Sequence, residues 1–492
     1  MLVLRTPREA ADWLRARGVA ELHCDSRKVG AGDGFVAWPG AATDGRKFVP
    51  MALQQGAKAC LVELAGSEAY AFADDAVAAY EGLKAATGPI GALFYGDPSR
   101  ELDVLAVTGT NGKTSTAWWL AQALTNLQPQ AIPCGIIGTL GIGRPPHVEA
   151  TGLTTPDPVL MQRHFRRFVQ EGARACAIEA SSIGIEERRM DGTRIRVAGF
   201  TNFTQDHLDY HGSMEAYWQA KAELFRWPGL QAAVVNVDDE KGELLEQQLH
   251  GGAIDLWTYS CVRDARLQAR EIGYTAEGLR FVIAEGAEWH ELRTSLIGQY
   301  NVSNLLGVVG MMRAIGVPLA NAVNACMDLL PVPGRMERIN VPGQPLVAVD
   351  YAHTPDALEK GLQALRDLAT QRGGQLWCVF GCGGDRDPTK RPLMAAVAEK
   401  NADRVVVTSD NPRSEKPEAI ISQVLLGLSH AECVEVQADR ARAIAETVAS
   451  ARAGDVILIA GKGHEDYQEV AGVKHPFSDQ AHAQAALKAR KP

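Results

Sequence analysis

Cysteine is scarce and scattered in this 492-residue sequence. The nine cysteines form no CxxC pair, and the closest two stand in CVFGC at Cys378 and Cys382. An odd count without regular spacing argues against a disulfide framework and is typical of reduced thiols. We therefore expect a cytoplasmic protein without structural disulfides.

Long apolar runs and an excess of positive charge are also missing. The first residues, MLVLRTPREAADWLRARG, show no extended apolar core and no small-residue cleavage site, so we expect no signal peptide. No run approaches the about 18–20 apolar residues of a membrane span. The net charge of -9 argues against a nucleic-acid partner bound through its phosphates, but it leaves small anionic ligands open.

The chain is too long for a single core, and its strand-like and helix-like segments alternate in three blocks. We place these blocks at residues 1–100, 101–331 and 332–492, with linkers near GDPSRELD and LLPVPGRMERI. Continuous apolar strands separated by helices indicate parallel sheets buried on both faces. The sequence predicts an α/β fold of three domains with mostly parallel sheets, in which the central domain binds a mononucleotide and the C-terminal domain is Rossmann-like.

Four apolar strand candidates in the last block end in polar loops: DYAH, GCGGDRD, SDNPR and GKGHE. Ligands of parallel sheets collect beyond the carboxyl ends of the strands. We therefore expect one shared site to hold Asp350, His353, Arg386, Arg413 and Glu465. The DNPR segment is either a plain Asn-Pro turn or a loop that presents Arg413 to a carboxylate.

The segment VLAVTGTNGKTSTAWWLAQAL (104–124) has the pattern of a strand, a glycine loop and a helix. Gly109 and Gly112 allow the backbone to curl, Lys113 adds a positive charge, and Thr114 offers a hydroxyl suited to Mg²⁺. Val107 stands where the usual P-loop has its first glycine. An ordinary tight turn is the alternative, but the flanking strand and helix favour binding of nucleotide phosphates.

Two further segments carry polar groups at strand ends. Glu179 ends the strand candidate in AIEASS, and Asp206 and His207 follow TNFTQ. Taken alone, Glu179 is typical of a surface acid and His207 of a capping or packing histidine. The alternative is a metal site, although histidine is an unusual ligand for Mg²⁺.

Several motifs in one order give the chain a family resemblance. TGTNGKT, EASS, TNFTQDHLDYHG, GQYNVSN, GRME and DYAHTPDAL together resemble the Mur ligases, and folylpolyglutamate synthases share part of this set. CDSRKVGAGDGFVAWPG, DNPR and GKGHEDYQ resemble the branch of the family that adds the third residue of the peptide. The resemblance covers essentially the whole chain.

The resemblance implies ATP-dependent amide formation during peptidoglycan precursor synthesis in the cytoplasm. ATP would phosphorylate the D-glutamyl carboxylate of UDP-N-acetylmuramoyl-L-alanyl-D-glutamate, and the amine of meso-2,6-diaminopimelate would attack the acyl phosphate. The cofactors implied are ATP and Mg²⁺, and we expect a monomer. Positioning and charge neutralisation dominate such phosphoryl transfer.

The resemblance also assigns residues around the nucleotide. The ATP-binding set is Gly109, Thr110, Asn111, Gly112, Lys113, Thr114, Ser115, Asn301, Arg335 and Asp350. The metal ligands implied are Thr114, Glu179 and His207, and the catalytic residues are Lys113, Glu179, His207 and Lys221. From sequence alone Lys221 is typical of a helical surface lysine. The resemblance implies that it is carbamylated to N6-carboxylysine, whose two oxygens can hold Mg²⁺.

The UDP-linked substrate would lie on the N-terminal domain and reach the central one. The set implied is Cys24, Ser26, the turn at 41–43, Leu153, Thr154, Thr155, Ser181, Glu187 and Arg189. Two positions depart from the family. In SSIGIEERR, Ile183 stands where relatives often carry His-Gly, and Glu187 stands where they carry Gln. An acid facing an anionic substrate is not an obvious replacement.

The resemblance places the acceptor amino acid at the C-terminal loops. The set implied is Arg386, Asp410, Asn411, Pro412, Arg413, Gly461 and Glu465. Arg413 would recognise the distal carboxylate that distinguishes diaminopimelate from L-lysine. The alternatives are an L-lysine ligase, which DNPR disfavours, and a folylpolyglutamate-type synthase, which the CDSR block disfavours. A non-catalytic scaffold is disfavoured by the joint presence of the four catalytic candidates.

Overall fold

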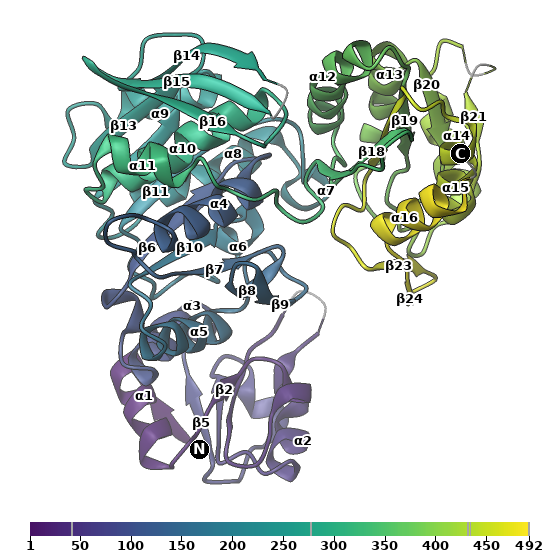
Figure 1. Cartoon of the computed structure of the whole chain (residues 1–492). Coiled ribbons are helices and arrows are strands. Elements are labelled where there is room, and N and C mark those ends of the chain that lie inside the picture. Colours follow the sequence, from purple (N-terminus) through teal and green to yellow (C-terminus); the bar gives the residue numbers. More distant parts are fainter. Residues whose placement is uncertain (41–42, 276–277, 431, 433, 491–492) are drawn as a thin grey trace.

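The computed structural model describes residues 1–40, 43–275, 278–430, 432 and 434–490. In these ranges the strands form sheets of five, eleven, six and two strands. Figure 1 shows the N-terminal part at one end of the central part and the C-terminal part beside the other end. The predicted α/β class with three mostly parallel units is confirmed. No helix in the described ranges is long and apolar enough to cross a membrane.

The N-terminal sheet has the strand order β1-β5-β4-β3-β2, and every pair in it is parallel. Helix α1 begins where Thr6 and Glu9 form a capping box, and its buried face carries Ala10, Ala11 and Leu14. The elements are β1 (Leu2–Leu4), α1 (Pro7–Ala16), β2 (Leu22–His23), β3 (Gly34–Ala37), α2 (Val49–Gln54), β4 (Ala59–Glu63), β5 (Val77–Tyr80) and α3 (Leu83–Phe94).

The central sheet has eleven strands in the order β16-β15-β14-β13-β12-β11-β6-β10-β7-β8-β9. Its middle strands are parallel, and the pairs at both edges are antiparallel. The strands are β6 (Asp103–Thr108), β7 (Cys134–Gly138), β8 (Gly141–Arg144), β9 (His147–Glu149), β10 (Ala175–Glu179), β11 (Val197–Phe200), β12 (Ala232–Asn236), β13 (Asp255–Ser260), β14 (Leu267–Tyr274), β15 (Leu279–Glu285) and β16 (Glu288–Thr294).

Helices cover both faces of the middle of this sheet, so the parallel strands there are apolar. In β6, Leu105 and Val107 pack on one face with α4 and α10, while Val104 and Ala106 pack on the other with α5. The helices are α4 (Lys113–Thr125), α5 (Pro158–Gln170), α6 (Ser182–Glu186), α7 (Leu208–His211), α8 (Met214–Ala222), α9 (Glu240–Leu249), α10 (Tyr300–Ala314) and α11 (Leu319–Ala325).

The C-terminal sheet has the order β17-β18-β22-β19-β20-β21, with only β17 antiparallel to its neighbour among the described strands. A separate hairpin, β23–β24, follows it. The elements are β17 (Glu337–Ile339), β18 (Leu346–Asp350), α12 (Pro355–Gln371), β19 (Leu376–Phe380), α13 (Lys390–Asn401), β20 (Arg404–Val407), α14 (Pro417–Leu425), β21 (Glu435–Val436), α15 (Arg440–Ser450), β22 (Val456–Ala460), β23 (Tyr467–Val470), β24 (Val473–Pro476) and α16 (Asp479–Ala489).

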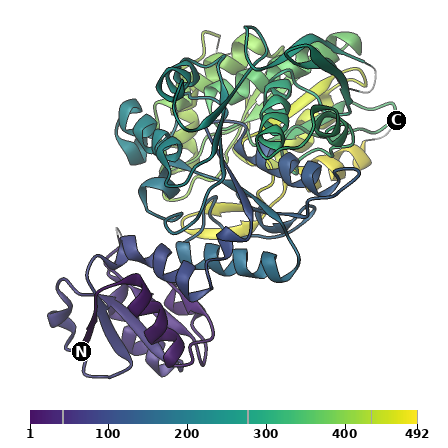
Figure 2. The same cartoon turned by 90° about the vertical axis from the view of Figure 1, so that its left-hand side faces the viewer.

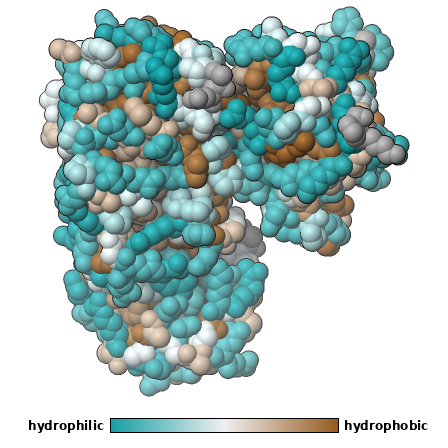
Figure 3. Space-filling view, viewed as in Figure 1, coloured by the Kyte–Doolittle hydropathy of each residue, from teal (hydrophilic) through white to brown (hydrophobic). Residues whose placement is uncertain are grey.

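The three parts are arranged around an open space. Figure 2 shows the N-terminal part projecting from one end of the rest of the molecule, and Figure 3 shows the surface hollowed between the N-terminal and C-terminal parts. The strands of the three large sheets lie within residues 2–80, 103–294 and 337–460. The predicted domain limits after residues 100 and 331 fall between these ranges and stay predictions.

Candidate functional site

The glycine loop after β6 is folded tightly around the side chain of Lys113. Gly109 and Gly112 both have positive φ, and a Cβ at either would overlap a side-chain oxygen of Thr201 or Asn304. Lys113 Nζ donates to the carbonyl oxygens of Gly109 at 2.9 Å and Thr110 at 2.8 Å. Helix α4 begins at Lys113, so its free amides face the same space. The loop therefore has the parts of a phosphate site.

Thr114 and Glu179 form a buried pair beside this loop. Thr114 Oγ1 donates to Glu179 Oε2 at 2.8 Å, and the amide of Thr139 donates to Oε1 at 2.8 Å. Arg335 donates to Thr114 Oγ1 at 3.1 Å from the C-terminal side. Glu179 is 1% exposed, so the surface-acid interpretation is wrong. A hydroxyl and a carboxylate next to a phosphate loop are the oxygen donors that Mg²⁺ prefers.

Lys221 on α8 is buried and points at the phosphate loop, so the surface-lysine interpretation is also wrong. It is 1% exposed, and its Nζ donates to the carbonyl oxygen of Gly109 at 2.7 Å. Burial, followed by the charge of Lys113, lowers the pKa of Lys221 well below its usual value. An amine held neutral in this way is the form that can react with carbon dioxide.

The loop at His207 reaches toward the C-terminal part. Asp206 is buried, and its carboxylate lies 2.6 Å from Lys390 Nζ, 3.5 Å from His207 Nε2 and 3.9 Å from His353 Nε2. Burial alone would raise the pKa of Asp206, but the charge interactions with His207, His353 and Lys390 hold it below its usual range. Burial lowers the pKa of His207 to about 3, against the opposing charge of Asp206.

No three His, Cys, Asp or Glu side chains in the described part of the chain are grouped to hold a metal by themselves. Magnesium sites at nucleotides use one or two carboxylates together with phosphate oxygens, so the Thr114 and Glu179 pair fits that ion.

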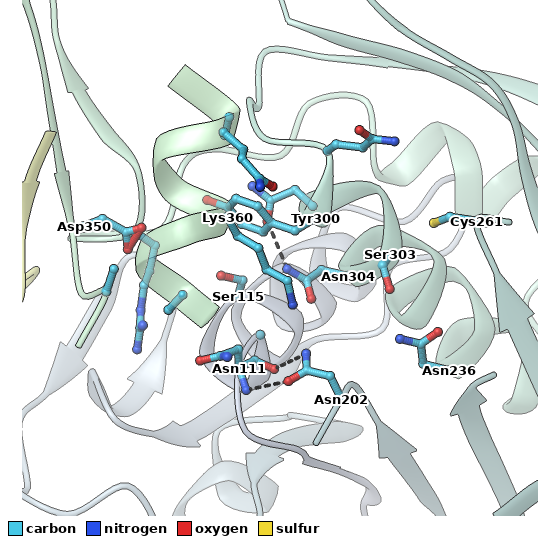
Figure 4. Close-up of a pocket in the computed structure, with 18 of the residues that line it drawn as sticks. Asn111, Ser115, Asn202, Asn236, Cys261, Tyr300, Ser303, Asn304, Asp350 and Lys360 are labelled. Carbon is cyan, nitrogen blue, oxygen red and sulfur yellow. Dashed lines mark hydrogen bonds between the residues drawn. The ribbon is translucent and has the colours of Figure 1, made fainter. Parts of the chain in front are cut away.

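A cavity of about 450 Å³ lies beside the phosphate loop, between the central part and α12. Figure 4 shows Lys360 and Tyr300 facing Asn111 and Ser115 across it. Burial raises the pKa of Asp350 to about 6, while Arg335 opposes this shift. The predicted ATP residues on its wall are Asn111, Gly112, Ser115, Asn301, Arg335 and Asp350.

Sequence reasoning missed Lys360 and Asn304 on the same wall. Asn304 is the last residue of the GQYNVSN motif, and Lys360 lies one helical turn after Asp356 on α12, 3.0 Å from its carboxylate. Asn304 stood inside a quoted motif, and Lys360 could have been found by extending DYAHTPDAL two residues along its helix.

Side chains of the central and C-terminal parts meet directly at this site. Asn111 Nδ2 donates to Asp356 Oδ2 at 2.7 Å, and Gln205 Nε2 donates to Thr389 Oγ1 at 3.1 Å. Together with the Lys390–Asp206 ion pair, these contacts link the phosphate loop to the third domain. His353 Nε2 lies 3.9 Å from the carboxylate of Asp206 in this junction.

Hydrogen bonds to two other segments hold the DNPR loop, so it is not a plain surface turn. Arg413 has φ 50°, and its amide donates to the carbonyl oxygen of Glu469 at 3.0 Å in β23. One guanidinium nitrogen of Arg413 donates to the carbonyl oxygen of Gly384 at 2.6 Å. This places Arg413 beside the loop after β19 that carries Arg386.

The remaining predicted acceptor residues form a buried polar network. Asn411 Nδ2 donates to Glu465 Oε2 at 2.7 Å, and a Cβ at Gly461 would overlap the carboxylate of Asp410. Sequence reasoning missed Lys462, which is fully buried and donates to both Asn411 at 3.0 Å and Glu465 at 3.1 Å. Its position in the GKGHE loop, at the end of a strand candidate, was the sequence signal that could have identified it. Pro412 lies between Asn411 and Arg413 in the same loop.

The predicted UDP-substrate residues fall into two groups. In the central part, Thr155 Oγ1 lies 2.9 Å from Ser181 Oγ, Arg189 donates to the carbonyl oxygen of Thr155 at 3.0 Å, and Thr154 lies near Thr139. Leu153 is exposed at the start of this segment. In the N-terminal part, Ser26 is buried and burial, followed by Asp157, raises the pKa of Cys24. Residues 41 and 42 of the predicted turn lie outside the described residues.

Glu187 is bonded to protein groups on both oxygens. Its Oε2 lies 2.6 Å from Lys84 Nζ on α3, and its Oε1 accepts from the hydroxyl of Tyr210 at 2.7 Å. The lysine bond and the tyrosine bond lower the pKa of Glu187 against the opposing effect of burial. The acid that departs from the family pattern is thus paired with a cation from the N-terminal part.

Comparison with known proteins adds three family-model matches. They are the Mur ligase family, catalytic domain at residues 19–90, the Mur ligase middle domain at residues 107–312, and the Mur ligase, glutamate ligase domain at residues 334–463.

Similar full-length proteins and structures are also found. The UDP-N-acetylmuramoyl-L-alanyl-D-glutamate–2,6-diaminopimelate ligase of Acidovorax sp. (strain JS42) is 61% identical, over 99% of this chain and 98% of that protein. A solved structure of a ligase with the same name is 35% identical with a TM-score of 0.65, over 96% of this chain and 95% of that one. The MurF ligase from Thermotoga maritima in complex with ADP is 17% identical, over 96% and 98% of the two chains, with a TM-score of 0.66, and shows the shared fold.

Proposed function

The chain belongs to the Mur ligase family, and from that premise we propose its reaction. It is an ATP-dependent ligase that adds meso-2,6-diaminopimelate to UDP-N-acetylmuramoyl-L-alanyl-D-glutamate in peptidoglycan precursor synthesis. The observation that carries this proposal is the near full-length identity of 61% to a ligase of that name. We place the reaction in the cytoplasm, where nucleotide-linked precursors are made, and infer that the enzyme acts as a monomer.

The nucleotide would bind in the cavity between the central part and α12. Its phosphates would lie on the amides of the glycine loop, with Lys113 as the nearest cation. Asn301, Arg335 and Asp350 line the same cavity and would surround the nucleotide. A magnesium ion held by Thr114 and Glu179, with His207 and a carbamylated Lys221 nearby, would neutralise charge on the phosphates.

The acyl donor and the acceptor amine would approach from opposite sides. Thr155, Ser181 and Arg189 would orient the glutamyl end of the UDP-linked substrate beside Glu179. Arg413 and Arg386 would bind the distal carboxylate of diaminopimelate, while Asp410 and Glu465 would face its ammonium groups. The contacts between the central and C-terminal parts would exclude water from the acyl phosphate until the amine attacks.

A panel of amino acids in a coupled assay of ADP release tests the proposal. We expect turnover that requires both the UDP-linked dipeptide and diaminopimelate, with L-lysine at least about 100-fold poorer in kcat/KM. Arg413→Ala should lose about 100-fold in kcat/KM for diaminopimelate, and Arg413→Lys should lose about 10-fold, because a lysine cannot form a bidentate pair.

The KM for ATP serves as the control, because Arg413 lies on a different loop from the nucleotide cavity. Efficient turnover of L-lysine would favour the lysine-adding alternative, and turnover of a folate with glutamate would favour the synthase alternative. Unchanged diaminopimelate kinetics in Arg413→Ala would refute the role assigned to that arginine.

A further inference from the structure

Lys84 joins the N-terminal part to the glutamyl end of the candidate substrate site. Its ammonium lies 2.6 Å from Glu187 Oε2, and the other oxygen of Glu187 is held by Tyr210 on α7. Tyr210 follows His207 in the same short segment, while Arg189 lies two residues beyond Glu187. The carboxylate of Glu187 thus connects helix α3 and the loop of His207 to the group of substrate candidates that contains Thr155.

The position of Lys84 is fixed by backbone packing. Lys84 and Gly88 lie one helical turn apart on the same face of α3. A Cβ at Gly88 would overlap the carbonyl of Asp191, and a Cβ at Gly192 would overlap the backbone of Gly88. Helix α3 and the 188–193 segment are therefore in backbone contact, and this contact sets the distance between Lys84 and Glu187.

The charges explain why this chain tolerates an acid at position 187. Without Lys84, the negative charge of Glu187 would neutralise the positive charge of the neighbouring Arg189. The UDP-linked substrate carries a diphosphate and carboxylates, so the loss of the Lys84 charge would weaken its binding. Salt would screen this effect only in part at distances shorter than the Debye length of about 8–10 Å. With Lys84 present, the three side chains Lys84, Glu187 and Arg189 keep a net positive charge.

We infer that Lys84 is a positioning residue for the UDP-linked substrate, which offsets the charge of Glu187 and leaves Arg189 free to face an anion. The inference rests on the proposed function, because it assumes an anionic substrate at this junction. It assigns Glu187 the role of holding Lys84, and not that of a direct substrate ligand.

Three variants test the inference in steady-state assays of ADP release. Lys84→Met should raise the KM for the UDP-linked dipeptide about 5- to 10-fold, with kcat within about 2-fold of wild type. Glu187→Gln should lower that KM, because it removes the negative charge while Lys84 stays. The double variant Lys84→Met/Glu187→Gln should return the KM to within about 2-fold of wild type. Raising the salt concentration should shrink the effect of Lys84→Met.

Lys58→Met is the matched control. Lys58 is an exposed lysine of the N-terminal part that precedes β4, whereas Lys84 follows β5, so the two lie at opposite ends of these parallel strands. It should leave the KM for the UDP-linked dipeptide unchanged. Thermal unfolding of all variants separates a loss of folding from a loss of binding.

The outcomes distinguish this inference from the proposed function. Failure of the wild type to use the UDP-linked dipeptide would overturn the proposed function itself. With an active wild type, a double variant as impaired as Lys84→Met would overturn the compensation, since rescue is its direct consequence. A KM raised by Glu187→Gln would show that Glu187 contacts substrate, and would overturn the inference as well.

Discussion

At the scale of a single residue, the burial and the contacts of Lys221 depend on segments that are distant in the sequence. In the sequence it stands in AYWQAKAELF, a segment typical of a helix with an exposed lysine. In the structure it lies 4.4 Å from the ring centroid of Tyr217 and donates to the carbonyl oxygen of Gly109. Local sequence could not show this, because the loop that buries Lys221 lies more than a hundred residues away in the chain.

We predict that Lys221 is carbamylated in the active enzyme. Activity should fall in buffer depleted of carbon dioxide and recover when bicarbonate is added, and ¹³C-labelled bicarbonate should give a carbamate signal by NMR of the native protein. Lys221→Arg should show neither the signal nor the recovery, because a guanidinium cannot form the carbamate. Full activity of wild type without carbon dioxide would contradict the prediction. Mass measured on denatured protein is uninformative, since the carbamate is labile.

The sequence located the phosphate loop and the residues that the structure gathers around Thr114, because each of them sits in a motif at the end of a strand. Lys84 carries no such mark. It acquires its place through Glu187, a carboxylate supplied by another segment. Pairings of this kind depend on how the sheets and helices pack, which apolar patterns do not specify.

At the scale of elements, apolar strands predicted the parallel middles of the sheets. They did not predict the antiparallel edges, such as β14–β16, whose residues alternate between buried and exposed only in part. Apart from the helix after the glycine loop, most helices were predicted only as stretches between strands. The buried polar residues on them, such as His164 on α5, therefore went unnoticed.

His164 should make the fold sensitive to acid. Burial, with the nearby charges of Arg163 and Arg167, lowers the pKa of His164 to about 4. Between pH 6.5 and 4 the unfolded chain binds a proton on this residue that the folded chain does not, so stability falls as the pH falls. The loss should reach about 2–3 kcal/mol near pH 4.

Chemical unfolding between pH 7 and 4 measures this effect. His164→Leu should show a flatter dependence of unfolding free energy on pH than wild type. His430→Gln, at a histidine that is 73% exposed, is the control and should keep the wild-type slope. Equal slopes in wild type and His164→Leu would exclude His164 as the acid-sensitive group.

At the scale of the whole molecule, the junction between the central and C-terminal parts is made of polar contacts. The buried Lys390–Asp206 pair is its strongest feature, and removing one partner of such a pair leaves an uncompensated charge that costs about 3–5 kcal/mol. Lys390→Met should therefore favour a more open arrangement.

We expect Lys390→Met to increase the radius of gyration in small-angle X-ray scattering and to lower kcat about 10-fold or more, with little change in the KM for the UDP-linked dipeptide. Lys400→Met, at an exposed lysine on the same helix α13, is the control. Scattering and kinetics identical to wild type would mean that the Lys390–Asp206 pair does not hold the two parts together.

The left-handed backbone of Arg413 has a consequence for the evolution of acceptor choice. Its amide donates to the carbonyl oxygen of Glu469 in β23, and its carbonyl oxygen accepts from the amide of Ala471 in the turn that follows β23. The direction of the guanidinium therefore depends on a hairpin more than fifty residues downstream. If Arg413 has the role proposed for it, grafting arginine alone into a lysine-adding relative would supply the charge without its orientation, so we expect a change of acceptor to require both segments.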